Sequence, residues 1–278
     1  MKRLIAIAML LLTVLSVGGV ILYSVHKEMA GGGSTPEISF AEEEIEVETG
    51  ADDQALLEGV TASDKEDGDI TTSLMVEHVS KFVEKNVVDV TYVVYDSQNH
   101  VARASRRVRY TNYVPPRFGM TEPMIFTART VADMLDHITA RDAIDGDISL
   151  KVHASYDNTT ADLANVGVHE VEISVTNSLG DTSRLMIPVR VVEDVIHSES
   201  IPLKDYLIYL KKGEAFDPKA YLAQETADDD DKDREKKEQI QISSTVNPSS
   251  PGVYAVDYTL VRNEMTAAMT RLIVVVTD

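Results

Sequence analysis

The sequence contains no cysteine and no tryptophan among its 278 residues. The absence of cysteine excludes a disulfide framework and a lipid-modified cysteine near the N-terminus. It leaves the compartment open, because an oxidising exterior permits disulfides without requiring them. Any β-sandwich that this chain forms must therefore be held by side-chain packing alone.

Basic residues are scarce, with 26 Lys and Arg against 46 Asp and Glu. Residues 1–30 contribute +2 to the whole-chain charge of −20, so residues 31–278 carry −22. No basic stripe is present to displace counterions from phosphates, which argues against nucleic-acid binding. Two interpretations of the acidic surface stay open: it keeps the protein soluble, or it recruits divalent cations.

Catalytic motifs are also missing. The seven His residues are scattered, and neither a His-Glu-x-x-His helix, a Gly-x-Ser-x-Gly turn nor a phosphate loop occurs. The paired carboxylates Asp67 and Asp69 lie on an expected open turn, without a pocket to separate their pKa values. The sequence therefore predicts no enzyme, no catalytic residue and no required cofactor.

One long hydrophobic run is present at the N-terminus. Leu4 to Val25 is 22 residues without a charge, or about 33 Å as a helix, which is enough to cross a membrane. Lys2 and Arg3 before it favour a cytoplasmic N-terminus, with the rest of the chain outside. The prediction is a single-pass membrane protein; the alternative is secretion after signal cleavage near Ser16-Val17-Gly18.

The remainder of the chain is repetitive. The motif Asp67-Gly68-Asp69-Ile70 returns 78 positions later as residues 145–148, and it is eroded near residues 231–233. Behind each copy lies a strand with alternating apolar residues, as in tandem β-domains. The inward positions of these strands are Val90, Tyr92 and Val94, then Val171, Ile173 and Val175, then Val256, Tyr258 and Leu260.

The predicted fold is all-β, with three tandem sandwiches after one N-terminal transmembrane helix. The joints near residues 113–116 and 193–202 are short, and Pro115-Pro116 stiffens the first. We therefore expect the domains to lie end to end and to reach about 80 to 100 Å. The expected segments are a membrane anchor at 1–30, a flexible linker at 31–36, and domains at 37–112, 113–194 and 195–278.

The acidic turn of the first repeat is the candidate metal site. Crowded oxygen ligands suit a hard cation such as Ca²⁺, although the spacing is not that of a known calcium loop. The alternative is an acidic turn without metal, in which Asp side chains bond the backbone two residues on. The candidate ligands are Asp64, Glu66, Asp67, Asp69 and Asp96.

The third repeat replaces this turn with a mixed-charge run from Asp228 to Glu238 that contains no glycine. A copy freed from the repeat pattern is a candidate place for a binding surface. The alternative is a solvated loop or a single helical turn. The candidate partner-binding residues are Asp228, Asp229, Asp230, Asp231 and Asp233.

Taken together, the Asp-Gly-Asp-Ile turn, the segment Tyr92 to Asn99 and the Arg-Val-rich strand after it resemble the bacterial immunoglobulin-like (Ig-like) repeats. These occur on Gram-positive surface proteins, and one branch is named for an insecticidal crystal protein. The resemblance is good for residues 37–110, fair for 115–193 and weak for 200–278. It implies immunoglobulin-like sandwiches with a surface role and no reaction.

The function expected from the sequence is a membrane-anchored extracellular stalk that also serves as an interaction or adhesion module at the bacterial cell surface. Its partner would be a cell-surface or envelope protein or a glycan. The alternative is a ligand-binding or regulatory ectodomain of a cell-envelope assembly or transport system. A buried cleft distinguishes the two, because ligand receptors need one and stalks do not.

Overall fold

The computed structural model describes Gly19 and residues 33–127, 131–155, 165–193, 200–223, 240–262 and 264–278. The chain divides into two compact units, residues 1–111 and 112–278. Below, the first repeat is residues 33–111, the second is 112–193 and the third is 200–278. The described residues form several β-sheets and very little helix, which confirms the all-β prediction.

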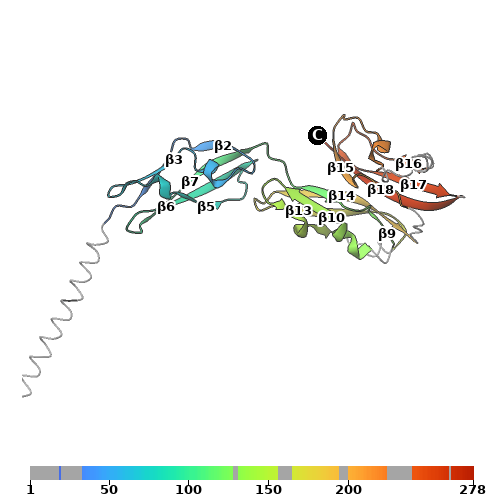
Figure 1. The fold of residues 1–278 in the computed structure, drawn as a ribbon, viewed down its shortest axis with the longest axis horizontal. Helices are drawn as coiled ribbons and strands as arrows, with labels where there is room; N and C mark the ends of the chain where they lie inside the picture. Colours follow the sequence, from blue (N-terminus) through green and yellow to red (C-terminus); the bar gives the residue numbers. More distant parts are fainter. Residues whose placement is uncertain are drawn as a thin grey trace, which may run out of the picture. The chain divides into compact units, whose positions relative to one another are not determined.

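The first repeat is built from two sheets (Figure 1). The smaller sheet has the order β1-β3-β4, with β1 at Glu37–Phe40, β3 at Val60–Asp64 and β4 at Gly68–Asp69. The larger has the order β2-β7-β6-β5, with β2 at Glu44–Glu48, β7 at Val101–Thr111, β6 at Val87–Tyr95 and β5 at Met75–Val79. A short helix, α2 at Asp53–Leu56, and a 3-10 turn, η1 at Thr71–Ser73, complete this unit.

The apolar alternation places the core of the first repeat as expected. Val90, Tyr92 and Val94 on β6 are fully buried. Strand β6 pairs with β7 in an antiparallel hairpin that turns at residues 96–100. Residues Asp96-Ser97-Gln98-Asn99, which the sequence places between two alternating strands, therefore form the turn of a hairpin.

The second repeat repeats this plan with two further sheets. The smaller has the order β11-β10-β8, with β11 at Gly146–Asp147, β10 at Ile138–Asp142 and β8 at Arg117–Met120. The larger has the order β12-β13-β14-β9, with β12 at His153–Ser155, β13 at Gly167–Thr176, β14 at Thr182–Val192 and β9 at Ile125–Thr127. Two 3-10 segments, η2 at Val131–His137 and η3 at Ser149–Lys151, lie on either side of β10 and β11.

The third repeat contributes one sheet in its described part, with the order β15-β18-β17-β16. Leu203 and Leu222 form an isolated bridge, and Pro218–Tyr221 is a 3-10 turn, η5. The strands are β15 at Leu207–Lys211, β18 at Met265–Thr277, β17 at Gly252–Arg262 and β16 at Ile240–Ser244.

The third sheet is buried on both faces. Leu210, Val256 and Leu272 belong to a cluster within the third repeat. Leu207, Ile273 and Val275 from the opposite face belong to the core cluster of the second repeat. The expected end-to-end arrangement is therefore wrong for the second and third repeats, because they share one hydrophobic core.

Polar contacts strengthen this shared core. Asp257 on β17 accepts hydrogen bonds from Arg271 Nε at 2.6 Å and from Arg190 Nη2 of the second repeat at 2.7 Å. Arg271, which is 2% exposed, also donates from Nη1 to the carbonyl of Pro188 at 2.9 Å. Burial acts to raise the pKa of Asp257, but the hydrogen bonds and charges of the two arginines outweigh it and lower that pKa.

The predicted membrane anchor, Leu4 to Val25, lies outside the described residues apart from Gly19. Within the described part of the chain, no helix is both long enough and apolar enough to cross a membrane. The boundary expected at residue 194 and the acidic run Asp228 to Glu238 also lie outside the described residues.

Candidate functional site

The acidic turn of the first repeat closes on itself through Asp64. Its Oδ1 accepts hydrogen bonds from the backbone N–H groups of Glu66 at 2.8 Å and Asp67 at 3.1 Å. Gly68 follows with a φ of 74°, a left-handed conformation that glycine adopts without steric cost. The residue types that signal a turn in the sequence therefore build that turn.

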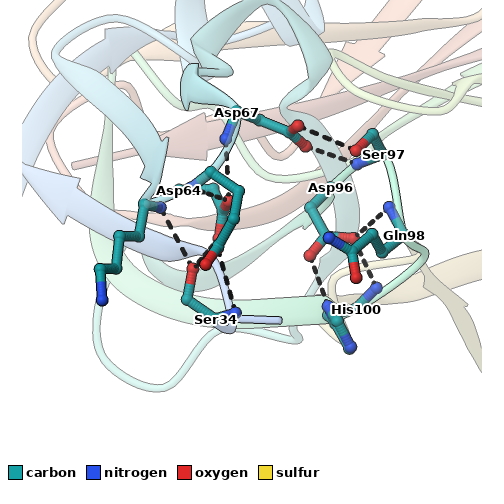
Figure 2. A network of polar contacts seen from close by, with 9 residues as sticks. Ser34, Asp64, Asp67, Asp96, Ser97, Gln98 and His100 are labelled. Atoms are coloured by element: carbon teal, nitrogen blue, oxygen red, sulfur yellow. Dashed lines mark hydrogen bonds and ion pairs between the residues drawn. The ribbon is translucent and has the colours of Figure 1, made fainter. Parts of the chain in front are cut away.

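Asp67 ties this turn to a second one. Its two carboxylate oxygens accept hydrogen bonds from the backbone N–H of Ser97 at 2.6 Å and from its hydroxyl at 2.8 Å. Ser97 lies in the turn between β6 and β7, in the other sheet (Figure 2). One carboxylate thus joins the ends of the two sheets.

Ser34 ties the incoming chain to the same turn. Its hydroxyl donates to Asp64 Oδ2 at 2.6 Å and also contacts Glu66, and its backbone N–H donates to Glu66 Oε2 at 3.1 Å (Figure 2). The Ser34 hydroxyl, together with backbone N–H groups of the turn, lowers the pKa of Asp64 to about 2 although burial acts to raise it. We call Ser34, Asp64, Asp67 and Ser97 the first entry clamp.

His100 and Asp96 flank this clamp. Asp96 accepts backbone hydrogen bonds from Gln98 at 2.8 Å and His100 at 2.7 Å, and its Oδ2 pairs with His100 Nδ1 at 2.6 Å. Burial acts to raise the pKa of Asp96, but these bonds outweigh it and lower the pKa. A Cβ on Gly33 would lie 2.7 Å from His100 Cε1, so the side chain of His100 would have to move to admit any other residue here.

The second repeat builds an equivalent clamp. Asp142 Oδ1 accepts from the backbone of Ile144 and Asp145, both at 2.9 Å. Asp145 accepts from the backbone N–H of Ser178 at 2.8 Å and from its hydroxyl at 2.5 Å, as Asp67 does from Ser97. We call Tyr113, Asp142, Asp145, Asn177 and Ser178 the second entry clamp.

Different side chains complete this second clamp. Asn177 stands where the first repeat has Asp96, and its amide donates to Asp142 Oδ2 at 3.1 Å and to the Tyr113 hydroxyl at 2.9 Å. Tyr113, in the incoming chain, donates to Asp181 at 2.8 Å. Burial and the Asp181 carboxylate strongly raise the pKa of Tyr113, so its hydroxyl stays protonated near neutrality.

The five predicted metal ligands fall into separate hydrogen-bonded groups. Asp64 and Glu66 surround Ser34, Asp67 faces Ser97, Asp96 faces His100, and Asp69 accepts from the backbone of Thr71 at 3.0 Å. Among the described residues, no three His, Cys, Asp or Glu side chains are grouped as a metal ion would need. Calcium binding stays a prediction, and the hydrogen bonds favour the turn without metal.

Sequence reasoning missed the residues that donate hydrogen bonds to the carboxylates. Ser34 was assigned to a flexible linker, and Tyr113 was assigned only to a joint between domains. The signal was present, because Ser34 and Tyr113 are 79 positions apart and Ser97 and Ser178 are 81 apart, close to the 78-residue spacing of the acidic motif. These polar residues recur with the repeat.

Residues 204–275 match the family described as bacterial surface protein, Ig-like domain. The chain therefore carries a bacterial surface Ig-like domain. The match lies in the third repeat, where the motifs that first suggested the family are weakest. Domains of this description belong to surface proteins, which indicates exposure outside the cell.

Two kinds of relatives accompany this match. An uncharacterized 81.3 kDa protein of Acholeplasma phage L2 is 48% identical over 63 residues, which is 23% of this chain and 8% of that protein. The CBM51-2 and INT domains of Clostridium perfringens ZmpB, solved in complex with GlcNAc, match 55% of this chain and 26% of theirs at 18% identity and a TM-score of 0.23. The chain thus spans only a small part of each.

Two further solved structures resemble the chain weakly. The lipoprotein BT2262 from Bacteroides thetaiotaomicron matches 86% of this chain and 98% of its own at 12% identity, with a TM-score of 0.20. Domains 6-7 of the surface layer protein SbsC match 56% of this chain and 98% of theirs at 12% identity, with a TM-score of 0.18. At such scores these likenesses support no argument about function.

Proposed function

We propose that this protein is a membrane-anchored stalk at the bacterial cell surface that presents a non-enzymatic contact surface. The observation that carries the proposal is the recurrence of the entry clamp in the first two repeats. In each, a carboxylate joins two turns and a polar residue of the incoming chain is held against them. A stalk needs such fixation, because a loose entry segment would leave each module free to swing.

The chemistry of the clamps supports a structural rather than a catalytic role. Their carboxylates already accept hydrogen bonds from backbone and hydroxyl donors, and they lie on turns rather than in an enclosed pocket. The charge of −22 over residues 31–278 suits an exposed, soluble surface. An anchor at Leu4 to Val25 would hold this stalk in the membrane.

The contact surface would belong to residues 112–278. The shared core of the second and third repeats makes a rigid platform, and the acidic residues Asp228 to Asp233 are the segment proposed to meet an envelope protein or glycan. The ligand-binding alternative is favoured by a different observation in the first unit, a cavity beside the buried Arg106.

Surface display can be tested in a bacterial host that expresses the full chain. Protease added to intact cells should remove the clamped repeats, while N-terminal sequencing of the membrane fraction should still find Met1. A soluble chain beginning near Val17 would replace the anchor with secretion. Complete protection of the repeats in intact cells would overturn the surface role itself.

A further inference from the structure

One core position differs in kind between the repeats. Arg106 on β7 faces inward opposite Val90, where the second repeat places Ile187 opposite Val171 and the third places Leu272 opposite Val256. Arg106 is 3% exposed, and Ile187 and Leu272 are fully buried. The first repeat thus buries a guanidinium where its relatives within the chain bury an aliphatic side chain.

This guanidinium is only partly satisfied. Nε donates to the Tyr92 hydroxyl at 3.0 Å, and Nη2 donates to the carbonyls of Leu56 at 2.8 Å and Glu58 at 2.6 Å. No described residue accepts a hydrogen bond from Nη1, which carries two of the five N–H groups of the side chain. No carboxylate of the described residues forms an ion pair with Arg106 either.

Aromatic rings hold the guanidinium in place without neutralising it. Its central carbon lies 5.4 Å from the ring centre of Tyr92 and 5.8 Å from that of Phe40. Cation–π contacts of this kind are favourable but leave the charge and the free N–H groups in place. A buried charge without a counter-ion is costly, so the arrangement favours an anion supplied from outside.

A cavity of about 360 Å³ lies beside Arg106. It is lined by Glu42, which connects β1 to β2, by Glu46 of β2, and by Glu58, Gly59 and Arg106, together with the apolar side chains of two neighbours. Its volume falls within the range of small-molecule sites, about 300 to 1,000 Å³.

Glycine at position 59 lines the cavity next to the guanidinium. Gly59 has a φ of 69°, and a Cβ placed on it would lie 3.8 Å from Nη1 of Arg106 and 3.3 Å from the Cβ of Ala41. The conformation itself disfavours a side chain. A side chain at position 59 would therefore contact the unpaired, buried Nη1 of Arg106.

The residues that line the cavity carry charges of both signs. One lining residue, Arg106, is a buried cation, while the three glutamates that line the cavity are exposed to solvent. An anion alone would be attracted by Arg106 and repelled by the glutamates, and a cation alone would meet the reverse. A molecule that carries both charges a few ångströms apart satisfies both.

We propose that the first repeat binds a small zwitterion, of the size and charge pattern of an amino acid, in this cavity. Its carboxylate would accept the free N–H groups of Arg106, and its ammonium would face Glu42, Glu46 and Glu58. This site is independent of the stalk role: its failure leaves surface display and clamping unaffected, and the reverse also holds.

The test is titration of the full chain, purified in mild detergent, with glycine, acetate and methylammonium as matched probes. Ligand-observed NMR detects weak binding, and calorimetry measures it. We expect saturable binding of glycine that is at least tenfold tighter than that of acetate or methylammonium. Glycine should also shift the Arg106 guanidinium resonance of the ¹⁵N-labelled protein.

Two variants and a control assign the signal. Arg106→Leu places the side chain of the third repeat at this position, so it should fold and should weaken glycine binding at least tenfold. Glu46→Gln combined with Glu58→Gln changes only exposed residues and should reduce the preference for glycine over acetate. Arg103→Leu removes one positive charge from the exposed face of the same strand, away from the cavity, and should leave binding unchanged.

Three results would overturn the proposal: no saturable signal with glycine, acetate bound as tightly as glycine, or glycine bound equally well by Arg106→Leu. If Arg106→Leu does not fold, the guanidinium resonance of the unaltered protein and the binding by the glutamate double variant still test the proposal. An unmoved resonance at saturating glycine would then exclude the site.

Discussion

The first and second repeats build the same clamp from different side chains. The acidic motif, its glycine and the serine that donates to it are kept, as Asp67 with Ser97 and as Asp145 with Ser178. The flanking partners change from Asp96 with His100 to Asn177 with Tyr113. The backbone geometry of the turns is thus kept in both repeats. The side chains that hydrogen-bond to the turns differ, provided that each donor still has an acceptor.

The cores of the two repeats, unlike their clamps, differ in chemical character. Strand pairing keeps Arg106 and Ile187 in the same register, yet one is a cation with free donors and the other is an aliphatic side chain in a closed core. Identical topology therefore does not make the interiors interchangeable. Exchanges between the two repeats can break or sharpen this comparison.

The largest loss of stability should come from introducing an arginine at the equivalent core position of the second repeat. Ile187→Arg would bury a charge without the carbonyls and aromatic rings that receive Arg106, at a cost of about 4 kcal/mol in the free energy of unfolding. Chemical denaturation, with separate probes for the two units, measures this. A loss of less than about 1 kcal/mol would mean that the second core accommodates a cation as the first does.

Removing the carboxylate shared by the second and third repeats should be nearly as damaging. Asp257→Ala leaves Arg271 buried without its partner, which costs about 3 kcal/mol. The transition of residues 112–278 should move to lower denaturant, while that of the first unit stays in place. The matched control is Glu77→Ala, which breaks the exposed pair with Arg103 and should barely move the first transition.

The clamps themselves should contribute less. Asp67→Ala and Asp145→Ala each remove the two hydrogen bonds to a serine, and we expect each to cost about 1 kcal/mol in its own unit. Hydrogen exchange should rise at the backbone N–H of Ser97 or Ser178 in the corresponding variant. Equal exchange in variant and unaltered protein would show that the clamp does not hold that turn.

Lowering the pH should cause a smaller change in stability. The pKa of Asp64 falls from an ordinary 3.8 to about 2 in the folded protein, so its contribution to stability is present above pH 3.8 and is lost as pH falls from there to about 2. Ser34→Ala removes the main cause of that shift. The denaturation midpoint of this variant should therefore depend less on pH in that window than the midpoint of the unaltered protein.

Calcium should have the smallest effect. Binding would require Asp64, Asp67 and Asp96 to exchange the donors that they already have for an ion that takes six to eight oxygens. We expect no change in the unfolding temperature of the first unit at millimolar Ca²⁺. A saturable heat in calorimetry that Asp64→Asn removes would establish the metal site instead.

Much of the fold was predictable because apolar alternation fixes which face of a strand is buried. Val90, Tyr92 and Val94 were placed correctly for that reason. The shared core was missed, although Leu272 to Val276 is an uninterrupted apolar run, which is typical of a strand buried on both faces. The repeat pattern predicts alternation in every copy, and the third repeat departs from it in this strand.

The candidate site was predicted only in part, for a different physical reason. Acidic residues around a glycine reveal a turn, but not which donors reach it, because Ser34 and Ser97 lie 30 positions or more from their partners. The alternation of β7 puts Arg106 on the same face as Val108 and Tyr110, but arginine is a residue type that is rarely buried, so the sequence does not single it out as a core residue. Its register opposite the fully buried Val90 shows that it faces inward.

The position of Ser34 has a mechanical consequence. Its bonds to Asp64 and Glu66 come before the first residue of β1 that pairs with β3, the pair Glu37 and Ser63. A pull on the chain from its N-terminal side therefore loads these polar contacts first and reaches the β1 ladder only after they break. Under tension, the first repeat should begin to yield at a serine and two carboxylates rather than at the edge of its sheet.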